Sequence, residues 1–250
     1  MKILYFKTND PRVKDFQDLI YKKYPFFLTE KAPDLILVAG GDGHMLHAIH
    51  DYQSYNVPFF GKARGTYNFF MNQFDNNVEI LDSLIHDSIK LHTIKIEGIA
   101  IHINAKYIGD AINDVIIGNS INGYHEFKIT SQDESFNDMK LHGSGICVST
   151  PLGSTGYNFN NFGPILPISS KLWVMTDIVC NKKINDIISP QKVLISAKES
   201  NIYIDGIECA KITNKTAVTL SQGKSISLAF LNKQHFIRRR IELSHRLRHE

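Results

Sequence analysis

The chain has 250 residues and a formal net charge of +3, and 43% of its residues are hydrophobic and 21% charged. This composition is typical of a soluble globular protein of one or two domains. Its apolar runs are shorter than the ~20 residues of a membrane-spanning helix, and its first residues read as a strand rather than a secretion signal, so we expect no membrane partner.

The first ninety residues alternate between strand and helix patterns. Strands are predicted at Ile3–Phe6, Leu35–Val38 and Val57–Gly61, and helices at Pro11–Tyr24, His44–Tyr52 and Ile80–Ile89. Alternation of this kind is typical of a parallel sheet covered by helices. We therefore expect an α/β N-terminal domain, residues 1–90, with a Rossmann-like parallel sheet.

From Leu91 to about Phe230 the chain consists of short runs of β-branched and aromatic residues. Turn pairs punctuate them, as at Asn122-Gly123, Asp205-Gly206 and Gln222-Gly223. A helix is indicated only at Ser169–Val179. We expect a β-rich C-terminal domain over residues 91–230.

Residues 238–250 hold five arginines and two glutamates, which carry the whole net charge. Because the rest of the chain is neutral, we expect a solvated or subunit-contacting tail and no nucleic-acid partner. The three cysteines, Cys147, Cys180 and Cys209, are far apart and lack zinc-binding spacing. Idle thiols of this kind favour a reducing, cytoplasmic location.

The strand Leu35–Val38 leads into Gly40-Gly41-Asp42-Gly43, directly before a predicted helix. A glycine turn at a helix N-terminus lets backbone N–H groups approach a phosphate. Asp42 is unusual there, because a carboxylate is unfavourable beside a negatively charged phosphate unless the carboxylate has a chemical role. It could bind a hydroxyl, accept its proton or hold a metal ion.

Two further motifs follow. Asn113-Asp114 offers an amide and a carboxylate that can hydrogen-bond an adenine edge and a ribose diol. Residues 143–167 contain Ser149-Thr150-Pro151-Leu152-Gly153-Ser154-Thr155-Gly156-Tyr157. In this order, over roughly residues 34–210, the three motifs resemble the NAD kinase family. The last one is far more specific than the glycine turn, which phosphofructokinases and lipid kinases also contain.

The resemblance implies the transfer of the γ-phosphoryl group of ATP, or of polyphosphate, to the 2′-hydroxyl of NAD, giving NADP. Asp42 would be the catalytic residue at that hydroxyl. Phosphate binding is implied for Gly40, Gly41, Gly43 and Arg64. NAD binding is implied for Asp42, Gly43, Phe69, Asn113, Asp114, Ser144, Thr150, Thr155, Gly156, Tyr157 and Asn160.

The resemblance also implies a divalent metal, most simply Mg²⁺, whose ligands no motif identifies. It further implies a homodimer or homotetramer, and a C-terminal segment 231–250 that returns to the first domain through a strand near His235–Ile237.

Several positions depart from the family pattern. In the first domain, Ala63 stands where the family usually has Asn, Asn68 where it has Gly, and His44 where it has Thr. In the second, Leu152 replaces a small residue, Gly156 an Ala and Ser144 an Asp. Since Ser144 removes a negative charge, we expect weaker discrimination between NAD and NADP.

Two other functions stay open. A lipid or sugar kinase could share the glycine turn, although residues 143–167 do not favour it. A non-catalytic NAD(P)-binding sensor is favoured by Ser144, Ala63 and Asn68 but not by the intact Gly40–Gly43 turn. His44, His47 and His50 could suggest a metal site, but two histidines on one helix face without a third ligand favour a surface stripe.

Overall fold

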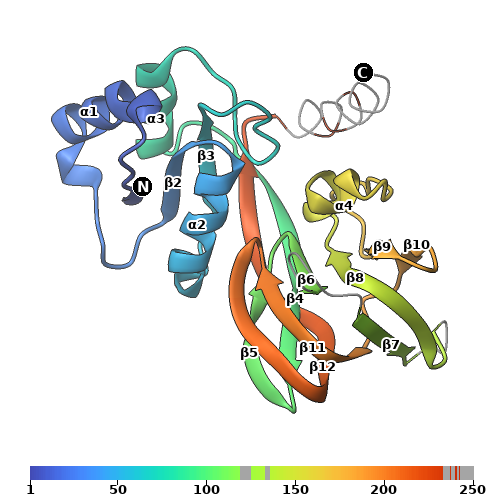
Figure 1. The fold of residues 1–250 in the computed structure, drawn as a ribbon. Coiled ribbons are helices and arrows are strands. Elements are labelled where there is room, and N and C mark those ends of the chain that lie inside the picture. Colours follow the sequence, from blue (N-terminus) through green and yellow to red (C-terminus); the bar gives the residue numbers. More distant parts are fainter. Residues whose placement is uncertain (119–124, 133–135, 233–236, 238–239, 241, 243–250) are drawn as a thin grey trace. The chain divides into compact units, whose positions relative to one another are not determined.

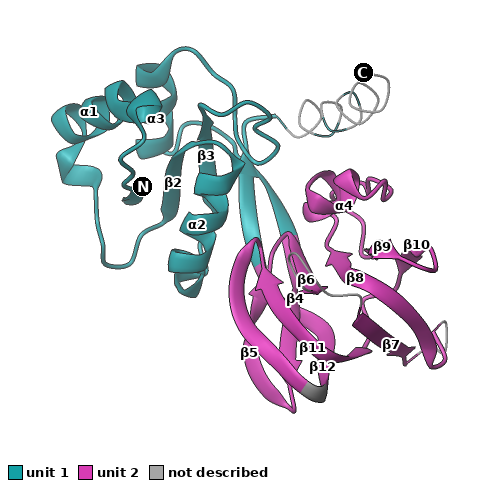
Figure 2. Ribbon diagram, in the orientation of Figure 1, with its two compact units in different colours: residues 1–95, 226–250 teal, residues 96–225 magenta. Residues whose placement is uncertain are grey.

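The computed structural model describes residues 1–118, 125–132, 136–232, 237, 240 and 242, apart from the side chains of 214 and 215 (Figure 1). The chain forms two compact units: unit 1 comprises residues 1–95 and 226–250, and unit 2 residues 96–225 (Figure 2). The boundaries fall within two long strands, β4 (His92–Ile103) and β12 (Ile207–Phe230). From the sequence we expect them at 90/91 and 230/231.

Unit 1 contains a parallel sheet whose strands are β1 (Ile3–Phe6), β2 (Leu35–Gly40) and β3 (Phe59–Ala63). β2 lies between β1 and β3, and all six of its residues are buried, as expected for a parallel strand covered on both faces. The end of β12 adds a fourth parallel strand, with Leu228 opposite Phe59.

Helices cover both faces of this sheet (Figure 1). α1 (Lys14–Lys23) and α3 (Asn77–Ile85) lie on one face and α2 (Asp42–Tyr52) on the other. Phe16 and Ile20, four residues apart on α1, enter a core shared with the strands and α3. Short 3-10 helices cover Pro11–Val13, Pro25–Phe27 and Gln53–Tyr55.

Unit 2 is antiparallel and β-rich. Besides parts of β4 and β12 it contains β5 (Lys106–Ala111), β6 (Asp114–Gly118), β7 (His125–Ser131), β8 (Met139–Ser149), β9 (Trp173–Cys180), β10 (Asn185–Ile188) and β11 (Val193–Ile204). β11 pairs with β6, β7 and β12, and β8 with β6, β7 and β9. A 3-10 turn (Gly153–Thr155) and the one-turn helix α4 (Tyr157–Asn160) follow β8.

Three sequence-based predictions of local structure are wrong. The helix at Ser169–Val179 is largely β9, because Trp173–Cys180 pairs with β8 on one side and β10 on the other. Gln222-Gly223 lies inside β12 rather than in a turn. The strand that returns to unit 1 ends at Phe230, whereas Ile237 is helical and residues 235 and 236 lie outside the described part.

The molecule is thus a sheet-rich α/β protein. Asn122-Gly123 lies outside the described residues. In the described ranges, no helix is long and apolar enough to cross a membrane.

Candidate active site

The glycine turn joins β2 to α2 in unit 1. β2 ends at Gly40, whose φ is +148°, Gly41 is the N-cap, and Asp42 is the first residue of α2. The first-turn N–H groups of a helix have no partner within the helix and attract anions. A methyl group added to Gly43 would meet nothing within 4 Å, so there is open space beside this turn.

A second loop packs against the turn. The Arg64 N–H donates to the Gly40 carbonyl at 2.7 Å, and a methyl group on Gly65 would lie 2.7 Å from the Gly41 Cα. Asn68 takes the left-handed conformation, φ +56°, and its Oδ1 accepts the Gly65 N–H at 2.8 Å. Asn tolerates this conformation, which explains how it can stand where the family usually has Gly.

The same loop holds the Asp42 carboxylate. The Phe70 N–H donates to Asp42 Oδ1 at 2.8 Å. Phe69 is buried, and its ring stacks on that of Tyr67, with centroids 6.0 Å apart and planes at 9°. The Arg64 side chain is exposed beside the turn. Unit 1 therefore gathers the predicted residues Gly40, Gly41, Asp42, Gly43, Arg64 and Phe69 around one end of α2.

Arg240 joins this group, although no sequence motif indicates it. It is only 3% exposed, its guanidinium carbon lies 6.0 Å from the Phe69 ring centroid, and the Asp42 charge acts on it. Burial lowers the pKa of Arg240 to about 10, and Asp42 opposes that change. We expect a solvated or subunit-contacting tail from the sequence, and the solvated alternative is wrong for Arg240, because this side chain is buried within the chain.

In unit 2 the loop Ile112–Asp114 is fixed by Asp205, which the sequence predicts only as part of a turn. Asp205 accepts the backbone N–H groups of Ile112, Asn113 and Asp114 at 2.9, 2.7 and 3.0 Å. Three N–H groups converging on one carboxylate make a rigid anchor. No local pattern reveals this pairing, because the two segments meet only in the folded unit.

Thr150 and Gly153 support the loop from another side. The Thr150 hydroxyl donates to the Ile112 carbonyl at 2.6 Å, and its N–H donates to the Asn113 carbonyl at 2.9 Å. A methyl group on Gly153 would lie 2.1 Å from that Asn113 oxygen, so only glycine fits there. Thr150 therefore supports the loop through its side chain, which is fully buried.

Asp114 is buried, and its pKa is raised to about 7, first by burial and then by the Asp205 charge. A methyl group on Gly156 would lie 3.7 Å from Asp114 Oδ2. Asn113 Oδ1 is buried and makes no hydrogen bond within the described residues. A buried acceptor and a perturbed carboxyl group side by side are features of a ligand site.

The remaining predicted residues follow β8. The Thr155 hydroxyl donates to the Leu152 carbonyl at 3.4 Å, and the side chains of Tyr157 and Asn160 are exposed. Ser149 lies directly opposite Asp114 in the ladder. Because side chains alternate along a strand, Ser144 is on the other face of β8 from Ser149.

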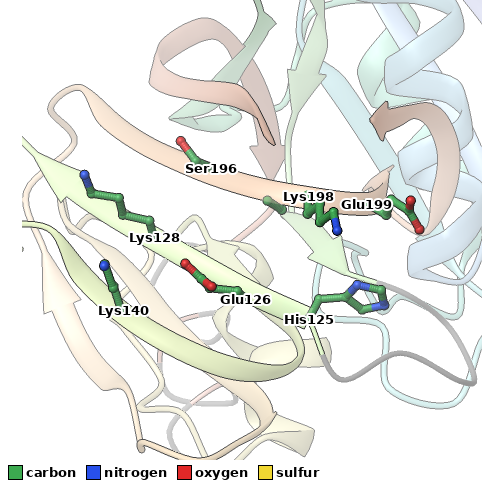
Figure 3. A pocket seen from close by; sticks show the side chains of 8 residues that line it. His125, Glu126, Lys128, Lys140, Ser196, Lys198 and Glu199 are labelled. Atoms are coloured by element: carbon green, nitrogen blue, oxygen red, sulfur yellow. The ribbon is translucent and has the colours of Figure 1, made fainter. Parts of the chain in front are cut away.

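Two cavities among the described residues lie elsewhere. One of about 530 Å³ opens between β7, β8 and β11, where Lys128, Lys140 and Lys198 are mixed with Glu126 and Glu199 (Figure 3). Another of about 570 Å³ in unit 1 is lined partly by Tyr5, Tyr21, Tyr52 and Tyr55. None of the predicted site residues lines either cavity.

No group of three or more His, Cys, Asp or Glu side chains that could hold a metal ion occurs among the described residues. His44 Nε2 lies 3.1 Å from the Thr8 hydroxyl and 3.7 Å from Asp10 Oδ2, while His47 is exposed. The position of His44 is therefore explained by its polar neighbours Thr8 and Asp10, without a metal ion.

No family model matches the chain. It is 32% identical over 232 residues to the NAD kinase of Rickettsia rickettsii (strain Sheila Smith), and 32% identical over 234 residues to that of Rickettsia prowazekii (strain Madrid E), with 89% of each chain covered in both cases.

Solved structures share the fold. An NAD kinase from Archaeoglobus fulgidus in complex with ATP superposes with a TM-score of 0.73 at 16% identity, covering 98% of both chains. Yeast NADH kinase complexed with NADH gives a TM-score of 0.79 at 17% identity, covering 97% of this chain and 87% of the other.

Proposed function

Because the chain belongs to the NAD kinase family, we infer that it is an ATP-dependent NAD kinase, a phosphotransferase with an alcohol acceptor. The 2′-oxygen of the NAD adenosine attacks the γ-phosphorus of ATP. A new P–O bond forms there, the bond to the β-phosphate oxygen breaks, and NADP and ADP leave.

The observation that carries the chemistry is the placement of Asp42 at the start of α2. Its Oδ1 is fixed by the Phe70 N–H, inside a turn with open space at Gly43. A carboxylate held in this way can orient the 2′-hydroxyl and accept its proton as the P–O bond forms. Backbone N–H groups of the Gly40–Gly43 turn and the exposed Arg64 would bind phosphate oxygens.

NAD recognition is proposed for the Asn113-Asp114 loop of unit 2. The support is the buried Asn113 Oδ1, which has no partner within the described residues, and the buried Asp114 carboxyl group. The amide suits an adenine edge and the carboxylate a ribose diol. Gly156 and Tyr157 would border the same ligand, with Thr155 and Asn160 as further proposed contacts.

A resident metal ion does not fit the described residues, since they offer no cluster of three or more metal-ligating side chains. Mg²⁺ commonly binds through substrate phosphates and one or two carboxylates. We propose that an Mg²⁺ requirement arises from the complex of the metal with ATP.

We further propose that the protein acts in the cytoplasm as a homo-oligomer. The three cysteines are free, which suits a reducing compartment. Phe162 is 86% exposed and Ile187, on β10, is 52% exposed, and an Asn185 amide of β10 donates to the Phe162 carbonyl. Exposed apolar side chains beside an edge strand favour contact with a second copy.

The test is to incubate the purified protein with ATP, Mg²⁺ and NAD, and to measure NADP with an NADP-specific dehydrogenase. We expect NADP to form only when ATP is present. A protein that binds NAD in calorimetry but forms no NADP under these conditions would instead be a sensor. Replacing ATP by polyphosphate in the same assay determines the donor.

A further inference from the structure

We propose that Arg240 is a positioning residue for the Asp42 carboxylate. The proposal rests on the function inferred above, in which Asp42 receives the proton of the 2′-hydroxyl. It assigns a role to a side chain near the end of the chain, where neither the motifs nor the family resemblance indicates one.

The geometry places both charged groups around one short segment. Asp42 Oδ1 accepts the Phe70 N–H at 2.8 Å, while the Arg240 guanidinium carbon lies 6.0 Å from the ring centroid of the preceding residue, Phe69. Arg240 is 3% exposed, and the Asp42 charge acts on it. Because Arg240 is buried and Asp42 is only partly exposed, water screens their interaction less than it screens a pair on the surface.

The chemistry of the turn gives this arrangement a purpose. Asp42 occupies a place that must also admit the phosphates of ATP, and an isolated carboxylate would repel them. A buried guanidinium beside it offsets that repulsion and restricts the carboxylate to one orientation. When Asp42 takes the proton and becomes neutral, the positive charge of Arg240 remains beside the phosphoryl group.

A purely structural role would also explain the burial of Arg240, since the side chain would then only anchor the C-terminal segment to unit 1. The two roles differ in what a mutation changes. An anchor alters stability independently of Asp42, whereas a positioning residue acts through Asp42 and affects kcat more than KM.

The experiment compares Arg240→Lys and Arg240→Met with the control Lys23→Met, which removes an exposed cation paired with Asp82 in the same unit. We expect Arg240→Met to lower kcat by at least about tenfold, while KM for NAD changes less than about threefold. Arg240→Lys, which keeps the charge, should recover part of kcat, and Lys23→Met should match the wild type. Equal kcat in all four proteins would overturn the proposal.

A double-mutant cycle with Asp42→Asn identifies the route of the effect. We expect Arg240→Lys to lower kcat measurably in the wild type but by less than about twofold in the Asp42→Asn background. The same loss in both backgrounds would show that Arg240 does not act through Asp42.

Melting temperatures in the cycle of wild type, Arg240→Met, Asp42→Asn and the double variant provide a readout without turnover. If Arg240→Met does not fold, Arg240→Lys, which keeps a buried cation, replaces it in this cycle. We expect a smaller loss of melting temperature when Asp42 is already Asn, and identical losses would overturn the proposal. If the wild type makes no NADP, the proposed function fails, while this stability cycle still reports on the charge interaction between Asp42 and Arg240.

Discussion

Two carboxyl groups of this protein have opposite electrostatic surroundings. Asp42 has the buried cation Arg240 as a neighbour, whereas Asp114 is buried near a second carboxylate, Asp205. Burial and the Asp205 charge favour the protonated form of Asp114. The same residue type is thereby suited to different tasks in the two units.

Replacing Asp42 by Asn should lower kcat by at least ~10²-fold, the scale for losing a positioned proton acceptor. The amide keeps the shape and can still accept the Phe70 N–H, so NAD affinity should change little. Steady-state kinetics and calorimetry on the same preparation check both parts. Turnover close to that of the wild type would contradict the role of Asp42.

The raised pKa of Asp114 predicts a pH-dependent stability. Its pKa is about 7 in the folded protein against an ordinary value of 3.8, so between these pH values the folded state binds the proton more tightly than the unfolded state. The free energy of unfolding should therefore fall as pH rises from about 4 to 7, and this contribution should level off above pH 7.

Melting temperatures at pH 5 and pH 8 for the wild type and Asp114→Asn measure this contribution, because other groups titrate equally in both. The wild type should lose more stability than the variant on going to pH 8. Parallel curves would mean that Asp114 titrates normally.

At the scale of elements, both candidate sites lie where a loop follows a strand and is fixed by a distant segment. The Gly40–Gly43 turn is packed against the loop after β3, and the loop after β5 is held by Asp205 and by the segment after β8. These contacts determine the loop conformations more than any local preference does.

Asp205→Ala should destabilise the protein by roughly 2–4 kcal/mol, because three backbone N–H groups would lose their acceptor. It should also weaken NAD binding by disordering the Asn113-Asp114 loop. Asp205→Asn, which retains one acceptor oxygen, is the matched control and should lose less of both. Urea denaturation and calorimetry test this, and unchanged NAD affinity in a folded Ala variant would refute it.

Two glycines of the turn region should respond to alanine in opposite ways. Gly65→Ala places a methyl group 2.7 Å from the Gly41 Cα and should cost about 1–3 kcal/mol. Gly43 lies inside α2, and the added methyl group of Gly43→Ala would have no neighbour within 4 Å. This substitution should therefore stabilise the fold by about 0.5–1 kcal/mol. It should nevertheless raise KM for ATP, since the methyl group occupies the phosphate space. Thermal denaturation of both variants decides the contrast.

At the scale of the whole molecule, unit 1 is built from both ends of the chain. β12 begins in unit 2 and ends beside β3 in unit 1. The residues that follow β12 therefore belong to unit 1. Arg240 belongs to that returning segment. The fold of unit 1 therefore depends on residues that lie beyond unit 2 in the sequence.

Ile187→Lys, on the edge strand β10, should reduce the oligomeric state of the protein. A charge on an exposed edge strand opposes pairing with a second copy. Light scattering coupled to gel filtration should show a smaller species than the wild type, while Ile207→Lys, at another exposed isoleucine, serves as control. If both variants match the wild type in mass, β10 is not part of the interface.

The sequence by itself determined the features that are local. The strand, glycine turn and helix around Asp42 could be predicted because turn and helix signals act over a few residues. The β-rich character after residue 91 followed from β-branched runs in the same way. Where local signals were weak, as at Ser169–Val179, pairing with strands on both sides decided the outcome.

Only the tertiary structure decided which distant side chains reach the candidate sites. Arg240 appears in the sequence as one charge in a basic run, and Asp205 as half of a turn. One is buried near Asp42, and the other anchors the Asn113-Asp114 loop. The reason is physical: a buried charge or a backbone donor needs a partner, and the fold rather than chain proximity supplies it.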